Sequence, residues 1–139
     1  MTFVLDSSVA LAWCFEDEQT PEVIALLREV AELGAVVPSL WPLEVLNGLT
    51  MAERRRRLDG SRRRQMAALL RELPINVDPD TAFVAWTDTA ALAERFRLTL
   101  YDAAYLELAI RKAVPIATLD EDLRRAAVTA GVRIKQTVR

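Results

Sequence analysis

Residues 101–122 (YDAAYLELAIRKAVPIATLDED) constrain the fold most, because this one stretch predicts a helix, a strand and acidic residues beside both. Asp102 falls in the first turn of the predicted helix, at the head of an apolar face. The apolar run 113–117 then predicts a short strand, and Asp120 and Asp122 follow its carboxyl end. Ligands of open α/β sheets bind outside the carboxyl ends of the strands. The stretch therefore predicts that a helix and a strand bring carboxylates to one rim of a sheet.

The rest of the chain alternates short apolar runs with helical patterns, which is typical of the α/β class. A helix that begins at Thr20-Pro21 and ends at Gly34 separates the first two apolar runs, which predicts one βαβ crossover. We therefore expect a mostly parallel sheet of short strands flanked by helices. Strands are predicted at residues 2–6, 35–39, 74–77, 113–117 and 132–135, and helices at residues 7–15, 20–33, 41–58, 61–72, 78–96, 101–112 and 119–130.

The composition is that of a globular protein, with 52% hydrophobic and 27% charged residues among 139. This length suits one domain, which we expect to span residues 1–139. No apolar run approaches the roughly 18 residues of a membrane span, and the N-terminus lacks the basic region of a signal peptide. A single cysteine, Cys14, cannot form an internal disulfide and suits a reducing compartment. The expected location is the cytoplasm.

Histidine is absent from the chain. Its absence excludes histidine general bases, zinc sites that use histidine, and Ser-His or Cys-His nucleophile pairs. A hydrolase with this composition must use carboxylates and a hard cation. The net charge is only −2, so binding of nucleic acid would require a local basic patch.

Five acids lie where predicted strands end or where the following helices begin: Asp6, Glu44, Asp102, Asp120 and Asp122. In a parallel sheet these ends meet at one edge. Clustered carboxylates repel each other, and a divalent cation removes that repulsion. Ligand sets made only of oxygen favour Mg²⁺ or Mn²⁺ over zinc or copper. The chemistry that follows is in-line attack of a metal-activated water on a phosphodiester.

Each acid also has an ordinary structural explanation. Asp6 is placed to cap the helix that follows it, and Glu44 to interact with a helix dipole. Thr118 and Glu121 fit a capping box, which would put Asp120 in an unremarkable first turn. A single acid therefore indicates little, and it is the placement of all five at one edge that predicts a metal site.

Gly48 shares a predicted helix face with Glu44 and Asn47. A glycine inside a helix costs about 1 kcal/mol, so its presence indicates that another group approaches this face closely. With Asn47 beside it, this favours a functional role for Glu44.

A basic segment carries seven arginines within eleven residues: Arg54, Arg55, Arg56, Arg57, Arg62, Arg63 and Arg64. We call this segment the arginine ridge. It is explained equally well as a solvated face that complements a helix dipole. The functional alternatives are contacts with RNA phosphates or docking of an acidic partner. Trp13, Trp41 and Trp86 are predicted to be core or dimer-interface residues and not platforms for bases.

Four segments of the sequence resemble a known family: FVLDSSVALAW (3–13), VPSLWPLEVLNGL (37–49), LYDAAYLELAIRKAVPIATLDEDLRRAA (100–127) and GVRI (131–134). The third is the most specific, because an Asp-Ala-x-Tyr helix followed by Ala-Thr-Leu-Asp is hard to meet by chance. Together they resemble the PIN-domain ribonucleases, in particular the VapC-type toxins of toxin–antitoxin pairs.

The resemblance implies a three-layer α/β/α fold and a site that holds Mg²⁺ or Mn²⁺. Members usually form homodimers and are blocked by a cognate antitoxin protein. Asp6, Glu44, Asp102 and Asp120 match the acidic quartet of the family, and Asp122 matches a further acid that some members have. Polar positions beside the metal are matched by Ser7, Asn47 and Thr118.

The sequence thus predicts a metal-dependent endoribonuclease that acts as the toxin of a toxin–antitoxin pair. The alternative is a non-catalytic binding module whose acids hold a basic segment of a partner. A metal phosphatase is disfavoured, because Asp6 is not followed by a second acid two residues on and no glycine-rich phosphate loop is present.

Overall fold

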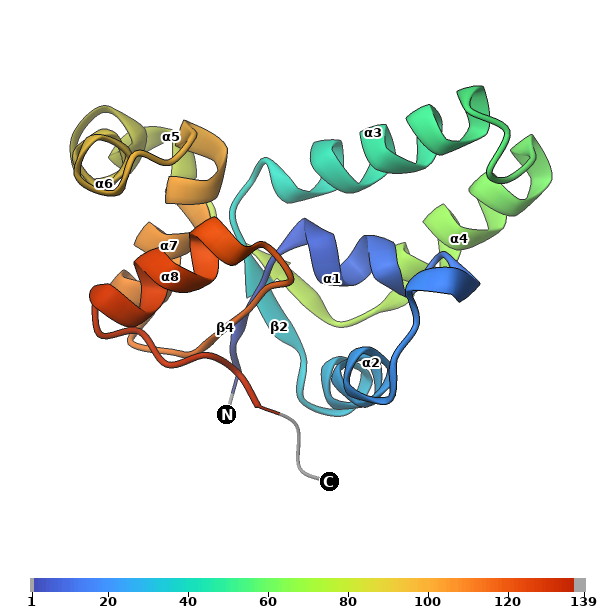
Figure 1. Cartoon of the computed structure of the whole chain (residues 1–139), viewed down its shortest axis with the longest axis horizontal. Helices are drawn as coiled ribbons and strands as arrows, with labels where there is room; N and C mark the ends of the chain where they lie inside the picture. Colours follow the sequence, from blue (N-terminus) through green and yellow to red (C-terminus); the bar gives the residue numbers. More distant parts are fainter. Residues whose placement is uncertain (1, 137–139) are drawn as a thin grey trace.

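Four short parallel strands form the centre of the protein, which a computed structural model describes for residues 2–136. They lie in the order β3-β2-β1-β4, with Val4 of β1 opposite both Val36 of β2 and Ile116 of β4. Helices α1 to α4 lie on one side of the sheet and α5 to α8 on the other (Figure 1). The predicted α/β fold, with a parallel sheet between helices, is confirmed. The strands are β1 (Val4–Leu5), β2 (Ala35–Val37), β3 (Ile75–Val77) and β4 (Ile116–Ala117).

Eight α-helices and two irregular helical turns connect and cover the strands within residues 2–136. No helix in this range is long and apolar enough to cross a bilayer. The helices are α1 (Ser7–Ala12), α2 (Pro21–Leu33), α3 (Trp41–Arg54), α4 (Gly60–Glu72), α5 (Thr81–Val84), α6 (Ala90–Phe96), α7 (Leu100–Lys112) and α8 (Glu121–Thr129), and the turns are the 3-10 turn η1 (Glu16–Glu18) and the π-helical turn η2 (Ala85–Thr89).

Side-chain caps set the first turns of the best-predicted helices. The Thr20 hydroxyl accepts from the Val23 amide at 3.1 Å, and Pro21 occupies the first turn, where its missing N–H costs nothing. Thr99 caps α7 in the same way, through the amide of Asp102 at 3.1 Å. Because Thr99 is the cap, the carboxylate of Asp102 is not needed to start its own helix.

Helix α7 is the most deeply buried helix described. All residues from 103 to 109 are buried, because α7 packs on β1 and β4 and is covered by η2, α6 and α8. An amphipathic helix would alternate buried and exposed faces, whereas this segment is enclosed on all sides. The acid at its head is therefore attached to a rigid element.

Several predicted boundaries are wrong. The strand predicted at 35–39 ends at Val37, because Pro38 has no N–H to extend the ladder. The helix predicted at 78–96 begins only at Thr81 and is interrupted by the π-helical turn η2, and Thr89 and Ala93 are its buried residues among those described. The strand predicted at 132–135 is reduced to one parallel bridge between Ile134 and Ile116.

The helix predicted at 41–58 ends early, at Arg54. Arg56 adopts a left-handed conformation (φ 62°), and the Arg57 amide donates back to the Ala52 carbonyl at 2.9 Å, a Schellman-type ending. The Arg57 guanidinium holds this turn by pairing with Asp17 (3.1 Å) and Glu18 (3.0 Å) of η1.

A buried ion network that the sequence did not predict joins α7 to the loop after β3. Arg111 donates to both oxygens of Asp78, at 3.1 and 2.7 Å, and to both oxygens of Glu107, at 2.8 and 3.0 Å. Both carboxylates are buried. The guanidinium lowers the pKa of Asp78, and the two carboxylates raise the pKa of Arg111. Two buried negative charges thus depend on one cation.

We predict that Arg111→Met lowers the free energy of unfolding by about 3 kcal/mol near neutral pH, because it removes the cation that pairs with two buried carboxylates. Urea denaturation measures this loss. The exposed Arg28 is a matched control, and Arg28→Met is expected to change stability by less than about 0.5 kcal/mol. Equal effects of the two substitutions would show that the network contributes nothing specific.

The same network predicts a pH dependence. The pKa of Asp78 is lowered in the folded state, so its contribution is complete above its unfolded pKa of about 4 and is lost as the pH falls through the lower folded value. Arg111→Met should therefore flatten the acid limb of the stability curve. An unchanged acid limb would contradict this assignment.

Candidate functional site

The order of the strands marks one position at the edge of the sheet. From β1 the chain proceeds to β2 and β3 through helices on one face, and it returns to β4 through helices on the other face (Figure 1). The carboxyl ends of β1 and β4 therefore flank the point where the connections change face, which is the usual place of a ligand crevice. Asp6 directly follows β1, and Asp120 lies three residues after β4.

Asp6 is the buried acid of this position, with an exposed fraction of 4%. Its Oδ2 accepts hydrogen bonds from the Ser8 hydroxyl at 2.6 Å and from the Thr118 hydroxyl at 2.7 Å. Its backbone occupies the N-cap position of α1, yet its side chain makes no capping hydrogen bond. Burial raises the pKa of Asp6, although both hydroxyls oppose this shift. The capping explanation therefore does not describe what this side chain does.

The two hydroxyls also hold the loop after β4. The Leu119 amide donates to Ser8 Oγ and the Asp120 amide donates to Thr118 Oγ1, each at 3.0 Å. Each hydroxyl thus accepts from the loop and donates to Asp6, which fixes the loop against β1. Thr118 lies beside Asp6, as expected of a polar position at the site. Ser8 was not predicted, although its place two residues after the acid was a usable signal.

Glu44 is half-buried and faces α7. Its Oε1 accepts from the hydroxyl of the fully buried Tyr105 at 2.6 Å. Burial raises the pKa of Glu44, and the bond from Tyr105 partly offsets that shift, as does the nearby Ser7 side chain. Tyr105 was missed as a site residue; its position one turn after Asp102 was the available signal.

Asp102 shows that the acids converge. Burial and then the negative charges of the other acids raise the pKa of Asp102 to about 6. The four contributing carboxylates are those of Asp120, Asp6, Glu44 and Asp122, in decreasing order of effect. The other four predicted acids therefore all lie within electrostatic reach of Asp102.

Asp120 and Asp122 form the outer part of the cluster. Asp120 itself caps α8, accepting from the Leu123 amide at 2.8 Å, so Asp120 takes the N-cap role that the predicted capping box assigned to Thr118. Asp122 is exposed and pairs with Arg125 at 3.0 Å. None of the other four acids of the cluster makes an ion pair within residues 2–136.

Gly48 brings two helices of the site together. A Cβ added there would lie 2.7 Å from both terminal methyl groups of Leu11 on α1. The predicted close approach to this helix face is therefore made by α1, which also carries Ser7 towards Glu44. Asn47 is exposed and makes no hydrogen bond in the described part of the chain.

The oxygen ligands available at this edge suit a hard cation that keeps some of its waters better than a cation enclosed entirely by protein ligands. All candidate ligands are carboxylates and hydroxyls, as Mg²⁺ and Mn²⁺ prefer. Among residues 2–136, however, no three Asp, Glu or Cys side chains lie close enough together to hold a metal ion directly. Mg²⁺ retains several waters and is commonly bound through one or two carboxylates. Residues 6, 44, 102 and 120 fit this mode without forming a preassembled four-ligand site.

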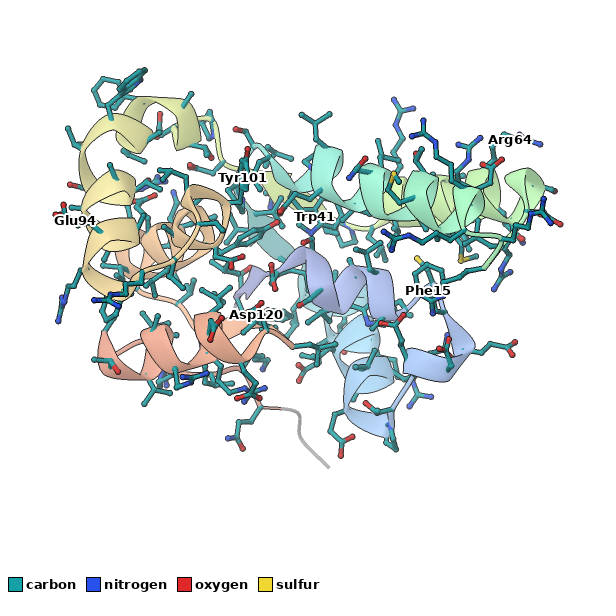
Figure 2. The ribbon with its side chains drawn as sticks, turned by 45° about the horizontal axis from the view of Figure 1, so that its top comes forward. Phe15, Trp41, Arg64, Glu94, Tyr101 and Asp120 are labelled. Carbon is teal, nitrogen blue, oxygen red and sulfur yellow. The ribbon has the colours of Figure 1, made fainter. Side chains whose placement is uncertain are left out.

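The arginine ridge lies away from the acids. Figure 2 shows Arg64 at the far end of the α3–α4 pair from Asp120 and Tyr101. About ten residues of α3 separate Glu44 from Arg54, which is roughly 15 Å along the axis. Arg57 pairs with η1 and Arg63 with Glu53, so part of the ridge is structural. The rest is exposed.

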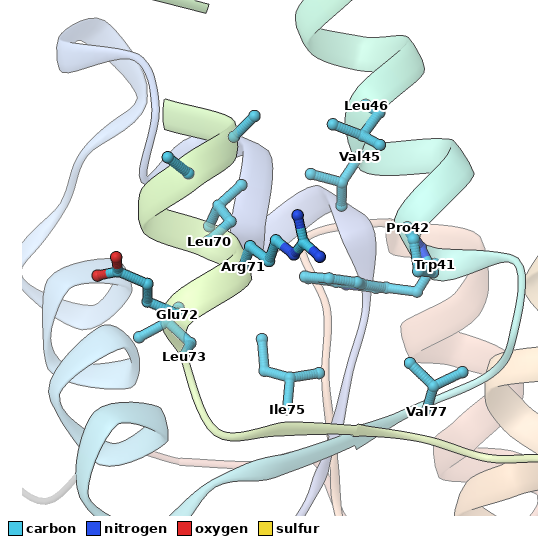
Figure 3. A pocket seen from close by; sticks show the side chains of 12 residues that line it. Trp41, Pro42, Val45, Leu46, Leu70, Arg71, Glu72, Leu73, Ile75 and Val77 are labelled. Carbon is cyan, nitrogen blue, oxygen red and sulfur yellow. The ribbon is translucent and has the colours of Figure 1, made fainter. Parts of the chain in front are cut away.

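An apolar groove of about 740 Å³ between α3 and α4 lies apart from this chemistry (Figure 3). Trp41 and Val45 of α3 line it, and Arg71 and Glu72 are its charged lining residues. None of the five acids borders it.

Two of the three tryptophans are core residues. Trp13 is buried and donates to the Val23 carbonyl at 2.7 Å, and Trp41 is buried beside the groove. Trp86, on η2, is 88% exposed. For Trp86 the core prediction is wrong, and the dimer-interface prediction stays untested.

Comparison with known proteins identifies the family. The PIN domain matches residues 3–128, and no curated sequence matches the chain significantly. PAE2754 from Pyrobaculum aerophilum has a similar structure, with 20% identity, a TM-score of 0.67, and coverage of 91% of this chain and 79% of that one.

Two further solved structures share the fold. VapC20 from Mycobacterium tuberculosis, described as a sarcin–ricin-loop-cleaving toxin, shows 17% identity, a TM-score of 0.67, and coverage of 97% of this chain and 99% of that one. FitAcB from Neisseria gonorrhoeae shows 16% identity, a TM-score of 0.66, and coverage of 96% of both chains. With the PIN-domain match extending over most of its length, the chain belongs to the PIN-domain family.

Proposed function

We propose that this protein is a metal-dependent endoribonuclease that acts as the toxin of a toxin–antitoxin pair. The observation that carries the proposal is the convergence of four other carboxylates on Asp102 at the carboxyl edge of the sheet. The VapC20 toxin supports the same function, since it shares the fold. We further propose that residues 1–139 are one domain that works in the cytoplasm.

A bound Mg²⁺ or Mn²⁺ would offset the negative charges, lower the pKa of a water and bind a phosphate oxygen. Asp6, Glu44, Asp102 and Asp120 would hold the ion, directly or through water, and Asp122 would add charge from the outer rim. Two hydroxyls fix the orientation of Asp6, and Tyr105 fixes that of Glu44. These contacts limit side-chain rotation, so the carboxylates meet the ion with little loss of rotamer freedom.

The proposed partners are an RNA substrate, a cognate antitoxin and a second copy of the chain. FitAcB and the VapBC2 complex from Rickettsia felis support an antitoxin, since both share this fold and VapBC2 was solved with a promoter DNA fragment. An acidic, partly buried site is suited to being blocked by a basic side chain of such a partner. The arginine ridge would guide RNA phosphates or bind acidic groups of the antitoxin.

The metal mechanism predicts that RNA cleavage by the purified protein requires Mg²⁺ or Mn²⁺ and stops in EDTA. Asp6→Ala and Asp102→Asn should each reduce the rate by about 100-fold or more, because each removes a carboxylate that interacts with the ion. Asp88→Asn, at an exposed site on η2, is the matched control. Full activity of either site variant would refute the mechanism.

Isothermal titration with Mn²⁺ distinguishes the nuclease from the alternative of a non-catalytic binding module. If the protein binds Mn²⁺ tightly and Asp102→Asn weakens that binding, the result supports the nuclease. If the free protein binds no Mn²⁺, the result supports a module that holds a basic segment of a partner. One observation favours this alternative: no three of the acids within residues 2–136 lie close enough together to hold a metal ion directly.

Repulsion within the cluster predicts that Asp102→Asn stabilises the metal-free protein. Near neutral pH we expect a gain of about 1 kcal/mol in the free energy of unfolding, after allowance for solvent screening of this half-exposed group. Urea denaturation in EDTA measures the gain, and added Mg²⁺ should stabilise the wild-type protein more than the variant. A loss of stability in EDTA would show that the acids do not repel in the folded state.

The arginine ridge predicts a salt-dependent contribution to RNA binding. Arg54, Arg55 and Arg64 are exposed and make no ion pair within residues 2–136. Replacing all three by glutamine should weaken RNA binding and reduce the slope of log affinity against log salt by about 0.7 for each lost phosphate contact. Arg28→Gln is the control. An unchanged slope would show that these arginines do not contact RNA phosphates and instead face solvent or bind the antitoxin.

A further inference from the structure

Helix α1 acts on two acids of the cluster through adjacent residues at its head. The Ser8 hydroxyl donates to Asp6 at 2.6 Å. Burial raises the pKa of Glu44, and the Ser7 side chain is close enough to act against that shift. Asp6 directly precedes α1, whereas Glu44 lies on α3. The separation of α1 and α3 therefore decides how far Glu44 lies from Asp6.

Helices α1 and α3 pack against each other through two pairs of residues (Figure 1). Ser7 lies beside Glu44, and the Leu11 side chain lies against Gly48. In each helix the two residues are four positions apart, which is about 6 Å along the axis. Residues spaced by four form one ridge of a helix surface, so the two ridges meet in register. The contact between Leu11 and Gly48 therefore sets the register that places Ser7 at Glu44.

The space above Gly48 is filled by Leu11. A Cβ added at Gly48 would lie 2.7 Å from both terminal methyl groups of Leu11 and 3.3 Å from its Cγ. Carbon atoms in good contact are about 3.5–4.0 Å apart, so we expect an added methyl group to move the helices apart by roughly 1 Å. Rotation of Leu11 about χ2 would leave its Cγ in place, and χ1 of a leucine in a helix has only two favourable values. The missing side chain at Gly48 is thus what allows α1 to lie this close to α3.

The other glycine within a helix, Gly60, is not confined in this way. A Cβ there would meet only the ends of the Arg64 and Glu53 side chains, at 3.2 and 3.3 Å. Both side chains are long and can move aside. Gly60→Ala is therefore a matched control for the same substitution at Gly48.

We propose that Leu11 and Gly48 are positioning residues, whose contact fixes the separation of α1 and α3 and so holds Glu44 at the distance from Asp6 that a shared cation requires. This inference rests on the proposed nuclease function and adds the apolar packing that aligns its acids. A displacement of about 1 Å can lower the rate of an enzyme about 100-fold. A contact between two apolar residues, neither of which touches the substrate, is therefore able to control the chemistry.

A double-mutant cycle tests the contact, with Mn²⁺ titration and with Mg²⁺-dependent cleavage of a mixed-sequence RNA oligonucleotide pool as readouts. Gly48→Ala should weaken Mn²⁺ binding and lower kcat, each about 10-fold or more, while KM changes by less than about 2-fold. Leu11→Ala removes the methyl groups that the new Cβ would meet. In that background Gly48→Ala should change both quantities by less than about 2-fold. Gly60→Ala should leave both unchanged.

The metal-free protein provides an independent readout. The chain has two tyrosines, and the hydroxyl of Tyr105 donates to Glu44 with the Ser7 side chain beside it. NMR of protein labelled with ¹³C at the tyrosine Cζ should therefore give one signal for each ring, and Tyr101→Phe assigns them. A change in the spacing of α1 and α3 alters the surroundings of the Tyr105 hydroxyl, whichever helix moves.

Gly48→Ala should shift the Tyr105 signal, and Leu11→Ala should restore it in the double variant. A general loss of stability would not produce this pattern. Leu11→Phe is a second variant, because it widens the spacing from α1 and leaves α3 unchanged, and it should produce the same losses. Should Gly48→Ala fail to fold, the test rests on Leu11→Phe, and wild-type behaviour of that variant would overturn the inference.

Three results would overturn the inference while leaving the nuclease proposal standing. They are an equal effect of Gly48→Ala in both backgrounds, wild-type values in both Gly48→Ala and Leu11→Phe, and a shifted Tyr105 signal without loss of Mn²⁺ affinity or kcat. Wild-type protein that binds no Mn²⁺ and cleaves no RNA would instead end the function proposal. The tyrosine signals of the metal-free protein would still show whether the contact sets the helix spacing.

Discussion

The buried charge of Asp6 is the constraint on which the site depends. A carboxylate with 4% exposure is costly unless polar groups replace the lost water. Here two hydroxyls replace it, and both also bind amides of the loop after β4. The need to solvate one acid therefore fixes that loop, and with it the place of Asp120. Asp6, the two hydroxyls and the loop that carries Asp120 are thus one hydrogen-bonded unit at the β1–β4 edge.

Two groups of carboxylates within residues 2–136 differ in their electrostatics. Asp78 and Glu107 are buried, but Arg111 contacts all four of their oxygens, and the pKa of Asp78 is lowered. At the β1–β4 edge Asp102 has no such partner, and its pKa is raised to about 6. A fold that can neutralise buried acids internally leaves this second group unneutralised, and that contrast is what indicates a ligand of positive charge.

The sequence predicted the parts of the site that follow from topology. Asp6, Glu44, Asp102 and Asp120 were placed together because strand ends of a parallel sheet share an edge. The partners that depend on how helices pack were not predictable in this way: Tyr105 reaches Glu44 across 61 positions of sequence, and Arg111 reaches Asp78 across 33. Element boundaries failed for local reasons, such as Pro38 after β2 and the π-helical turn before α6, which periodicity does not reveal.

The acids repel one another, and the place of Asp102 in the fold explains how the folded chain tolerates this repulsion. Repulsion among the acids acts on Asp102, in the first turn of α7, and it would push that turn outward. Residues 103–109 of the same helix are buried on every side, and Arg111 ties its last turn to the loop after β3. Displacing Asp102 would therefore disturb the best-packed segment described. The repulsion persists because the buried part of α7 holds Asp102 in place, and a cation bound at this edge, as proposed above, would relieve it.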